Sequence, residues 1–315
     1  MGSFWSQPLR VECTEHAQLT TSRTINSKLW FVNNKALQYR INGYLAKYKA
    51  KYKAKYFLKL YAFSLVGNHY HLVVRFPKGN RSEFFRDFNA RIAEAVRFYV
   101  PEFEGGPVFE RRFTPQVLPL DADLEKYFFY SALQPVSSGL TEKISDYDDY
   151  NSFSDAASQT PRTYKVFNYG AYNAAKRTNP HVKREQFMEE HTLSYDKLPH
   201  LEHLPLAEYK KTLLAKLEEK RLEIVRDRIA KGKGFFGKEN LRKVVPGSTP
   251  SNTKKGGMRP LVLSCCMETK KNFLSFYFGV VANYRKAVER YRMGDFAAEF
   301  PPGTFRPHGM CLCPT

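Results

Sequence analysis

Residues 60–76 read LYAFSLVGNHYHLVVRF, and this stretch predicts the centre of the fold. Leu60–Val66 and His69–Phe76 are rich in aliphatic and aromatic residues and have the length of strands. The dipeptide Gly67-Asn68 between them favours a tight hairpin turn. The sequence therefore predicts two antiparallel strands joined by a two-residue turn.

The segments on either side of this hairpin alternate between strand and helix patterns. The predicted elements are a strand over Ala17–Ile25, helices over Ala36–Lys59 and Arg81–Tyr99, a strand over Val108–Leu118 and a helix over Asp121–Val136. In chain order the elements run β-α-β-β-α-β-α. This order is typical of the α+β class, and it predicts a ferredoxin-like antiparallel sheet with helices on one face.

The composition changes after this predicted domain. Residues 141–163 are rich in Ser, Asp and Tyr, which predicts a surface connection. Beyond it, Pro205–Ala230 and Lys271–Tyr291 have helical periodicity, and the Gly- and Lys-rich residues between them predict a mobile loop. We therefore expect a first domain over residues 1–160 and a mainly α-helical, basic extension over residues 161–315, whose role the sequence does not reveal.

The charge balance points to a polyanionic partner. The 315-residue chain has 50 Lys and Arg against 31 Asp and Glu, a formal net charge of +19. Such an excess favours nucleic acid, because phosphate contacts release bound counterions. No apolar run is long enough to span a membrane, and the N-terminal residues lack the pattern of a signal peptide, so we expect a cytoplasmic protein.

The cysteines do not predict a structural metal site or disulfides. The spacing of the five cysteines fits neither a disulfide framework nor paired CxxC motifs. His308, Cys311 and Cys313 have residue types that can bind metal, but we expect them to form a reduced tail. The sequence therefore directs attention to the histidines of the central hairpin.

His69 and His71 are candidate metal ligands. Residues two apart on a strand point to the same face, so both imidazoles are expected to converge. Two histidines leave open positions on a divalent metal, which a phosphate oxygen can occupy. Alone, however, such a pair is more often two half-exposed histidines on a sheet, so a metal site needs a third ligand and a partner for chemistry.

The last helix of the first domain offers both. Tyr130 and Gln134 are four residues apart and share a helix face. The carbonyl oxygen of Gln134 suits Mg²⁺ or Mn²⁺, and the phenol of Tyr130 can attack a phosphate that the metal polarises. Tyr127 lies three residues earlier and is an equal candidate on this reasoning.

Several blocks of the chain, in order, resemble the REP-associated tyrosine transposases, which are bacterial single-tyrosine HUH transposases. The match covers about residues 17–155. The matching blocks are Thr21–Thr24, Tyr61–Leu72, Val108–Phe113, Tyr130–Val136 with Gly139-Leu140, and Asp146-Tyr147 with Tyr150 and Ser152.

The resemblance implies an HUH nuclease domain and a metal-dependent endonuclease and strand transferase acting on single-stranded DNA. It implies that His69, His71 and Gln134 hold Mg²⁺ or Mn²⁺, and that Tyr130, rather than Tyr127, is the nucleophile that forms a 5′-phosphotyrosine. It also implies a DNA hairpin beside a single-stranded tag as the ligand, and a bacterial, nucleoid-associated location.

The chain departs from the family pattern at three places. Val66-Gly67 replaces the usual Met-Pro before the His-Tyr-His triplet, and Gln134 replaces the usual Asn. Ser137-Ser138 replaces the usual Arg-Ala. A glutamine still offers an amide oxygen to a metal, so the departures bear on the DNA target and the subgroup.

Basic residues near the predicted sheet are the expected DNA contacts, with interleaved aromatic rings as stacking platforms for unpaired bases. We expect the loop over Lys231–Arg259 to add a second basic contact. The predicted DNA-binding residues are Arg23, Lys51, Lys53, Lys55, Arg75, Lys78, Arg81, Arg111 and Arg112.

Two other functions compete with this interpretation. One is a domesticated protein that binds structured DNA or RNA without cutting it. The other is an HUH replication initiator, but such proteins usually carry a helicase, and the chain has no GxxxxGK[ST] phosphate loop. The sequence favours neither a monomer nor a homodimer.

Overall fold

The structure, a computed structural model, describes residues 9–250 and 259–307, except the side chains of Lys53, Lys55 and Tyr56. The predicted tail of His308, Cys311 and Cys313 therefore lies outside the described residues. Within them the helices and strands alternate in the order that the sequence predicts for the first domain.

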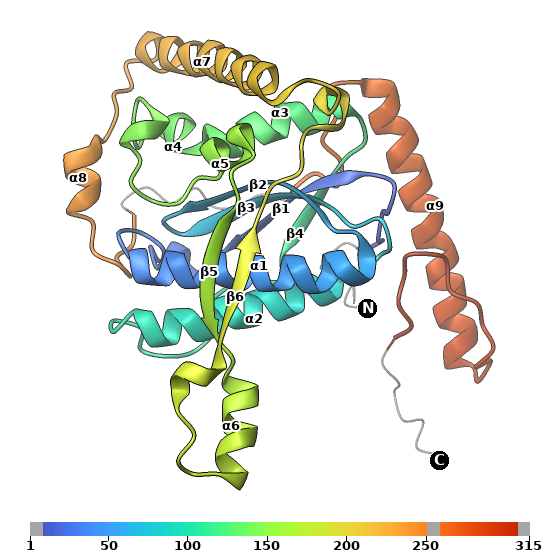
Figure 1. The fold of residues 1–315 in the computed structure, drawn as a ribbon. Helices are drawn as coiled ribbons and strands as arrows, with labels where there is room; N and C mark the ends of the chain where they lie inside the picture. The colour runs from blue at the N-terminus through green and yellow to red at the C-terminus, as the bar shows by residue number, and fades with distance from the viewer. Residues whose placement is uncertain (1–8, 251–258, 308–315) are drawn as a thin grey trace.

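A four-stranded antiparallel sheet forms the centre of the molecule (Figure 1). Its strands are β1 (Ala17–Arg23), β2 (Lys59–Val66), β3 (His69–Arg75) and β4 (Thr114–Leu118), and they lie in the order β2-β3-β1-β4. This arrangement confirms the predicted α+β class and the ferredoxin-like sheet. The predicted hairpin is present with its two-residue turn, because Val66 pairs with His69.

Helices cover both faces of this sheet. α1 (Lys35–Tyr56) and α2 (Arg81–Tyr99) lie on one face, where Tyr70 of β3 packs against Phe88 of α2 with ring centroids 5.8 Å apart. α3 (Asp121–Ala132) lies on the other face, where Ser131 hydrogen bonds with Ser64 of β2 at 3.0 Å. α1 and α2 share one face as predicted, but α3 lies on the opposite face, so the prediction that the helices gather on one face is wrong for α3 (Figure 1).

The helix predicted over 121–136 is interrupted at Leu133. α3 ends at Ala132, and a short helix, α4 (Gln134–Ser137), begins after Leu133. Pro135 explains the break, because its ring has no N–H to donate and clashes with the carbonyl of the preceding turn. The predicted strand over 108–118 also shortens to β4, and Phe109 forms only an isolated bridge with Thr24.

Residues 141–163 are more than a surface connection. They contain η2 (Ile144–Asp146) and α5 (Phe153–Ser158), and the side chain of Phe153 is buried in the core. The backbone runs beside the β2 edge, where Leu65 N–H donates to Tyr150 O and Ser152 N–H donates to Phe63 O, each at 3.0 Å. The backbone of this segment therefore closes one edge of the sheet.

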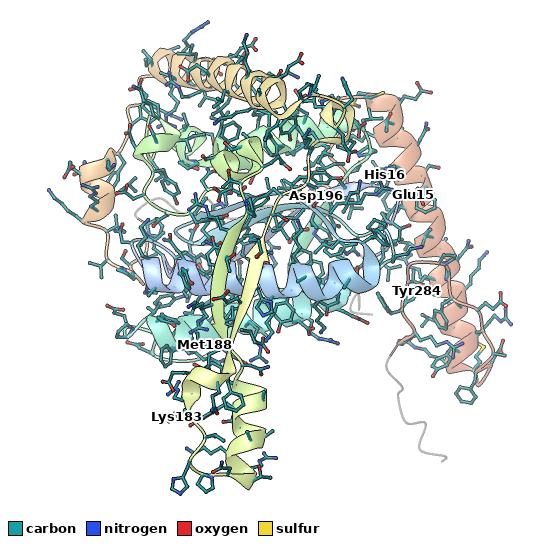
Figure 2. All side chains as sticks on the ribbon, in the orientation of Figure 1. Glu15, His16, Lys183, Met188, Asp196 and Tyr284 are labelled. Carbon is teal, nitrogen blue, oxygen red and sulfur yellow. The ribbon has the colours of Figure 1, made fainter. Side chains whose placement is uncertain are left out.

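The extension begins with strands rather than helices. β5 (Arg162–Phe167) and β6 (Met188–Leu193) form an antiparallel hairpin that packs on α1. Tyr164, Val166 and Leu193 join the core there. Between the two strands, α6 (Tyr169–Thr178) and η3 (Arg184–Phe187) form an arm away from the sheet, with Lys183 between them and Met188 at the start of β6 (Figure 2).

The rest of the extension contains the predicted helices. α7 (Leu206–Ala230) packs on α4 and α5, and η4 (Pro199–Leu201) precedes it. α8 (Lys238–Arg242) falls within the predicted mobile loop. α9 (Met267–Arg292) lies along one side of the molecule, and its Tyr284 donates to the carbonyl of Phe305 at 3.1 Å (Figures 1 and 2). No helix among the described residues is long and apolar enough to cross a membrane.

The residues before α9 cover the second edge of the sheet. Val262 pairs in parallel with Val117 of β4, and Val117 N–H donates to Leu261 O at 2.9 Å. Leu263 N–H donates in return to Val117 O at 2.8 Å. An exposed strand edge invites pairing with other chains, so this segment closes an edge that β4 would otherwise present to solvent.

Gly43 lets the β5–β6 hairpin approach α1 closely, because a Cβ at this position would lie 2.8 Å from Val166 Cγ2. We predict that Gly43→Leu lowers the free energy of unfolding by about 1–3 kcal/mol through overpacking. Urea denaturation measures the change. Gly279→Leu in α9 is the matched control, because nothing lies within 4 Å of its added Cβ; an equal loss in both variants would contradict the close packing.

Candidate metal centre and nucleic-acid interface

His69 and His71 converge on one point above the sheet. Both lie on the face of β3 that α3 covers, and their Nε2 atoms are 3.0 Å apart. The side chain of His71 is 4% exposed, whereas that of His69 is partly exposed. The pair therefore combines the buried ring of His71 with the more exposed ring of His69, which a ligand can reach.

Hydrogen bonds to the other nitrogen of each ring hold this orientation. Asn68 Oδ1 lies 2.7 Å from His69 Nδ1, and Thr21 Oγ1 lies 3.1 Å from His71 Nδ1. An amide oxygen only accepts, so His69 Nδ1 carries the proton and its Nε2 offers a lone pair. The Thr21 hydroxyl can donate or accept, so it can stabilise either tautomer of His71.

Strand register brings Thr21 to His71. Thr21 of β1 pairs directly with His71 of β3, and Arg23 pairs with His69. Paired residues on neighbouring strands point to the same face. The adjacent Ser22 points to the opposite face, where its hydroxyl donates to the Tyr70 phenol at 3.0 Å.

Both histidines are neutral at physiological pH. Burial, with smaller contributions from the charges of Arg23 and Arg259, lowers the pKa of His69 to about 3. Burial also lowers the pKa of His71, with smaller contributions from His69 and Arg259, while a hydrogen bond with Gln134 opposes the change. A neutral imidazole is the form that ligates a metal, so the rings need little deprotonation before they bind one.

The predicted residues of the last helix are beside this pair. The Tyr130 ring lies 5.5 Å from that of His71, centroid to centroid, and Tyr130 is 42% exposed. Gln134 is 5% exposed and hydrogen bonds with His71 through its side chain. Tyr127 contacts Tyr130, with centroids 5.6 Å apart, and burial raises the pKa of the Tyr127 phenol.

The arrangement of these donors fits a divalent metal. Two nitrogens held about 2.1 Å from one ion, at roughly a right angle, lie about 3 Å from one another. The Nε2 atoms of His69 and His71 have this separation, and the Nδ1 contacts already aim both of them inward. Across residues 9–250 and 259–307, no group of three His, Cys, Asp or Glu side chains could hold a metal, so the amide of Gln134 is the candidate third ligand.

The predicted DNA-binding residues do not gather at one place. Arg23 pairs with His69, and the Glu110 N–H donates to Arg23 O at 2.9 Å, so the backbone before Arg111 lies beside Arg23. Arg112 is exposed on the same loop. Arg75 is the last residue of β3, at the end away from His69, and it donates to Thr14 O at 3.2 Å. Lys78 follows in the next turn.

Two of the remaining predicted contacts have structural partners. Arg81 is 3% exposed and donates to Val11 O at 3.1 Å and Gln18 Oε1 at 3.3 Å, so the prediction that it contacts DNA is wrong. Its guanidinium satisfies buried acceptors at the start of α2. Lys51 of α1 is exposed but forms an ion pair with Asp87 at 3.1 Å, on the face of the sheet away from the histidines. The side chains of Lys53 and Lys55 lie outside the described residues.

The sequence reasoning missed the residues that orient the histidines. Asn68 was expected only to form the turn, and Thr21 only to belong to the first strand. The signal for Asn68 was available, because an amide next to a candidate ligand can reach its ring. The contact with Thr21 depends on the register of β1 against β3, which strand periodicity alone does not give.

Comparisons with known proteins give a structural similarity at low sequence identity. No protein-family model matches the chain, and no curated protein sequence matches it. Among solved structures, the chain is similar to the REP-associated tyrosine transposase bound to a REP hairpin. The TM-score is 0.38 at 16% sequence identity, and the similarity covers 48% of this chain and 84% of the transposase chain.

The Thr21 hydroxyl provides a test of the metal centre. We predict that Thr21→Val weakens Mn²⁺ binding about 10–100-fold, because ligand histidines lose orientation and basicity without their outer hydrogen bond. Isothermal titration calorimetry measures the affinity. Ser22→Ala is the matched control, since its hydroxyl bonds to Tyr70 on the opposite face. Equal affinity in Thr21→Val and the wild type would contradict the assigned role.

Proposed function

We propose that the protein is a metal-dependent endonuclease and strand transferase that acts on single-stranded DNA through a covalent 5′-phosphotyrosine. The observation that carries this proposal is the convergence of the His69 and His71 Nε2 atoms, 3.0 Å apart, under the partly exposed ring of Tyr130. A histidine pair with a purely structural role would not require an exposed tyrosine phenol beside it. The net charge of +19 supports a polyanionic substrate.

Each side chain of the centre has a role in this reaction. His69, His71 and Gln134 would hold Mg²⁺ or Mn²⁺, which when bound supplies positive charge to the scissile phosphate. The Tyr130 oxygen attacks the phosphorus and loses its proton to solvent. The bond from phosphorus to the 3′ oxygen breaks, and that oxygen leaves as a 3′-OH after taking up a proton. The phosphotyrosine conserves the diester energy, so a second 3′-OH can reverse the step and join strands.

Tyr130 suits the nucleophile better than Tyr127. Tyr130 is exposed enough to reach a phosphate, and its ring packs against His71. Tyr127 is partly buried against the core, and burial raises the pKa of its phenol, which disfavours the phenolate. The sequence resemblance independently assigns the nucleophile to Tyr130.

The proposed ligand is a DNA hairpin with a single-stranded flank. The resemblance to hairpin-recognising transposases in the blocks around the His-Tyr-His triplet and Tyr130 supports this choice. Arg23 pairs with His69, and Arg111 follows Glu110, whose N–H donates to Arg23 O; both would supply charge for the backbone of the flank. Phosphate contacts of this kind position a strand without reading its sequence.

Covalent adduct formation tests the proposal. With Mn²⁺ and a pool of single-stranded hairpin oligonucleotides, the wild-type protein is expected to form a denaturation-resistant protein–DNA adduct, visible as a gel shift. Tyr130→Phe should abolish the adduct, because it removes the attacking oxygen and little else. Tyr127→Phe is the control and should retain the adduct. An adduct in Tyr130→Phe would refute the assignment, and the lack of any adduct in the wild type would favour a binding protein that does not cleave.

A further inference from the structure

The arm between β5 and β6, residues 168–187, extends beyond the side of the sheet that α1 and α2 cover (Figure 1). Its strands pack on α1, whereas the histidines lie on the opposite face, beside Tyr130 of α3. All ten residues of α6 are described, and none of them is buried, so this helix adds nothing to the hydrophobic core. The arm is therefore separate from both the core and the candidate metal centre.

Aromatic rings hold the arm together and fix two of its cations. Tyr172 of α6 packs against Phe167 and Phe187, with ring centroids 5.3 and 5.5 Å away. The Arg184 guanidinium lies 4.9 Å from the Phe167 centroid and 5.9 Å from that of Tyr172. Lys176 Nζ lies 5.7 Å from the Tyr172 centroid. Cation–π contacts with one shared ring therefore bring a cation of α6 and a cation of η3 together.

Positive charge dominates the surface of the arm. Its four Lys and Arg residues, all exposed, are Lys176, Arg177, Lys183 and Arg184. Glu185 is the one carboxylate in the same range of sequence. Among the residues that the structure describes, none of the four cations has an Asp or Glu within 4.0 Å. The carboxylates of β6 are paired elsewhere, Glu189 with Lys47 and Glu190 with Lys165.

The helix dipole explains only part of this charge. The C-terminal end of a helix favours cations, which accounts for Lys176 and Arg177 in the last turn of α6. Lys183 and Arg184 lie beyond the helix, and Figure 2 shows Lys183 on the arm. Asn173 shares a helix face with Lys176 and Arg177, and these three side chains line a shallow hollow. Arginine, lysine and asparagine are side chains that contact the phosphates of nucleic acids.

We propose that the arm binds the phosphate backbone of duplex DNA, at a surface separate from the metal centre. The choice of DNA rests on the proposed function, whereas binding at the arm requires neither the metal nor Tyr130. The rings of Phe167, Tyr172 and Phe187 pack on one another and under cations, so they are not open platforms for unpaired bases, and this favours a paired strand. α6 contains no Leu, Ile, Phe or Trp, the side chains that amphipathic helices insert into membranes.

Equilibrium binding of duplex DNA in EDTA tests the proposal apart from cleavage. Fluorescence anisotropy of the full chain with a labelled, fully paired duplex gives Kd over a range of salt concentrations. The double variant Arg177→Gln, Lys183→Gln changes two exposed side chains and leaves the cations that stack on the rings in place. It is expected to weaken binding about tenfold or more at low salt, and the slope of log Kd against log salt should fall by about 1.8, because two phosphate contacts with B-DNA are lost.

Two matched variants separate the arm from the overall charge of the protein. Arg177→Lys with Lys183→Arg keeps both charges and should keep the wild-type salt slope. Lys286→Gln with Arg292→Gln removes the same charge from exposed positions of α9, on another side of the molecule, and should match the wild type (Figure 1). Wild-type affinity and slope in the Arg177→Gln, Lys183→Gln variant, or an equal loss in the α9 variant, would overturn the proposal.

Two further measurements address the other partners and the proposed reaction. Co-sedimentation with phosphatidylserine vesicles tests a membrane partner; vesicle binding that the Arg177→Gln, Lys183→Gln variant loses, with its duplex binding unchanged, would also overturn the proposal. The same variant is expected to form the covalent adduct on a short single-stranded oligonucleotide as the wild type does, because the arm is separate from Tyr130. Failure of the wild type to form an adduct would refute the cleavage reaction, and loss of duplex binding in the arm variant would still support the arm as a DNA-binding surface.

Discussion

The convergence of His69 and His71 is the feature on which the rest of the site depends. Residues two apart on β3 share a face, but only the Nδ1 contacts with Asn68 and Thr21 turn both Nε2 atoms inward to a separation of 3.0 Å. Burial keeps both rings neutral. The sheet therefore brings the two Nε2 atoms to one point before any ligand arrives, where they share a hydrogen bond, and the pairing of β1 with β3 is what makes this possible.

The C-terminal extension packs against the same sheet. The residues around Val262 close the β4 edge, while residues 150–152 close the β2 edge. The β5–β6 hairpin and α7 pack on the helices of the sheet domain. The later part of the chain thus protects the sheet from edge pairing.

Local patterns in the sequence predicted much of the fold. The β2–β3 hairpin, α2 and the two long helices of the extension follow from periodicity and turn residues. The burial of Arg81 and the β5–β6 hairpin did not follow, because each depends on contacts between segments far apart in the chain. The break at Leu133 has a local cause in Pro135, which the helical pattern of residues 121–136 concealed. At the candidate site, the sequence could propose His69, His71, Tyr130 and Gln134, which the structure brings close together. The register that brings Thr21 to His71 was not, since strand periodicity gives the face of a residue but not its partner.

The position of a bound metal tests the central claim most directly. Crystals of the full chain soaked in Mn²⁺ and measured at a wavelength where manganese scatters anomalously would locate the ion. The account predicts an anomalous peak about 2.0–2.3 Å from the Nε2 atoms of both His69 and His71, with their Nδ1 contacts to Asn68 and Thr21 retained. A fully soaked crystal with no peak at this point, and the two rings still bonded to one another, would contradict it.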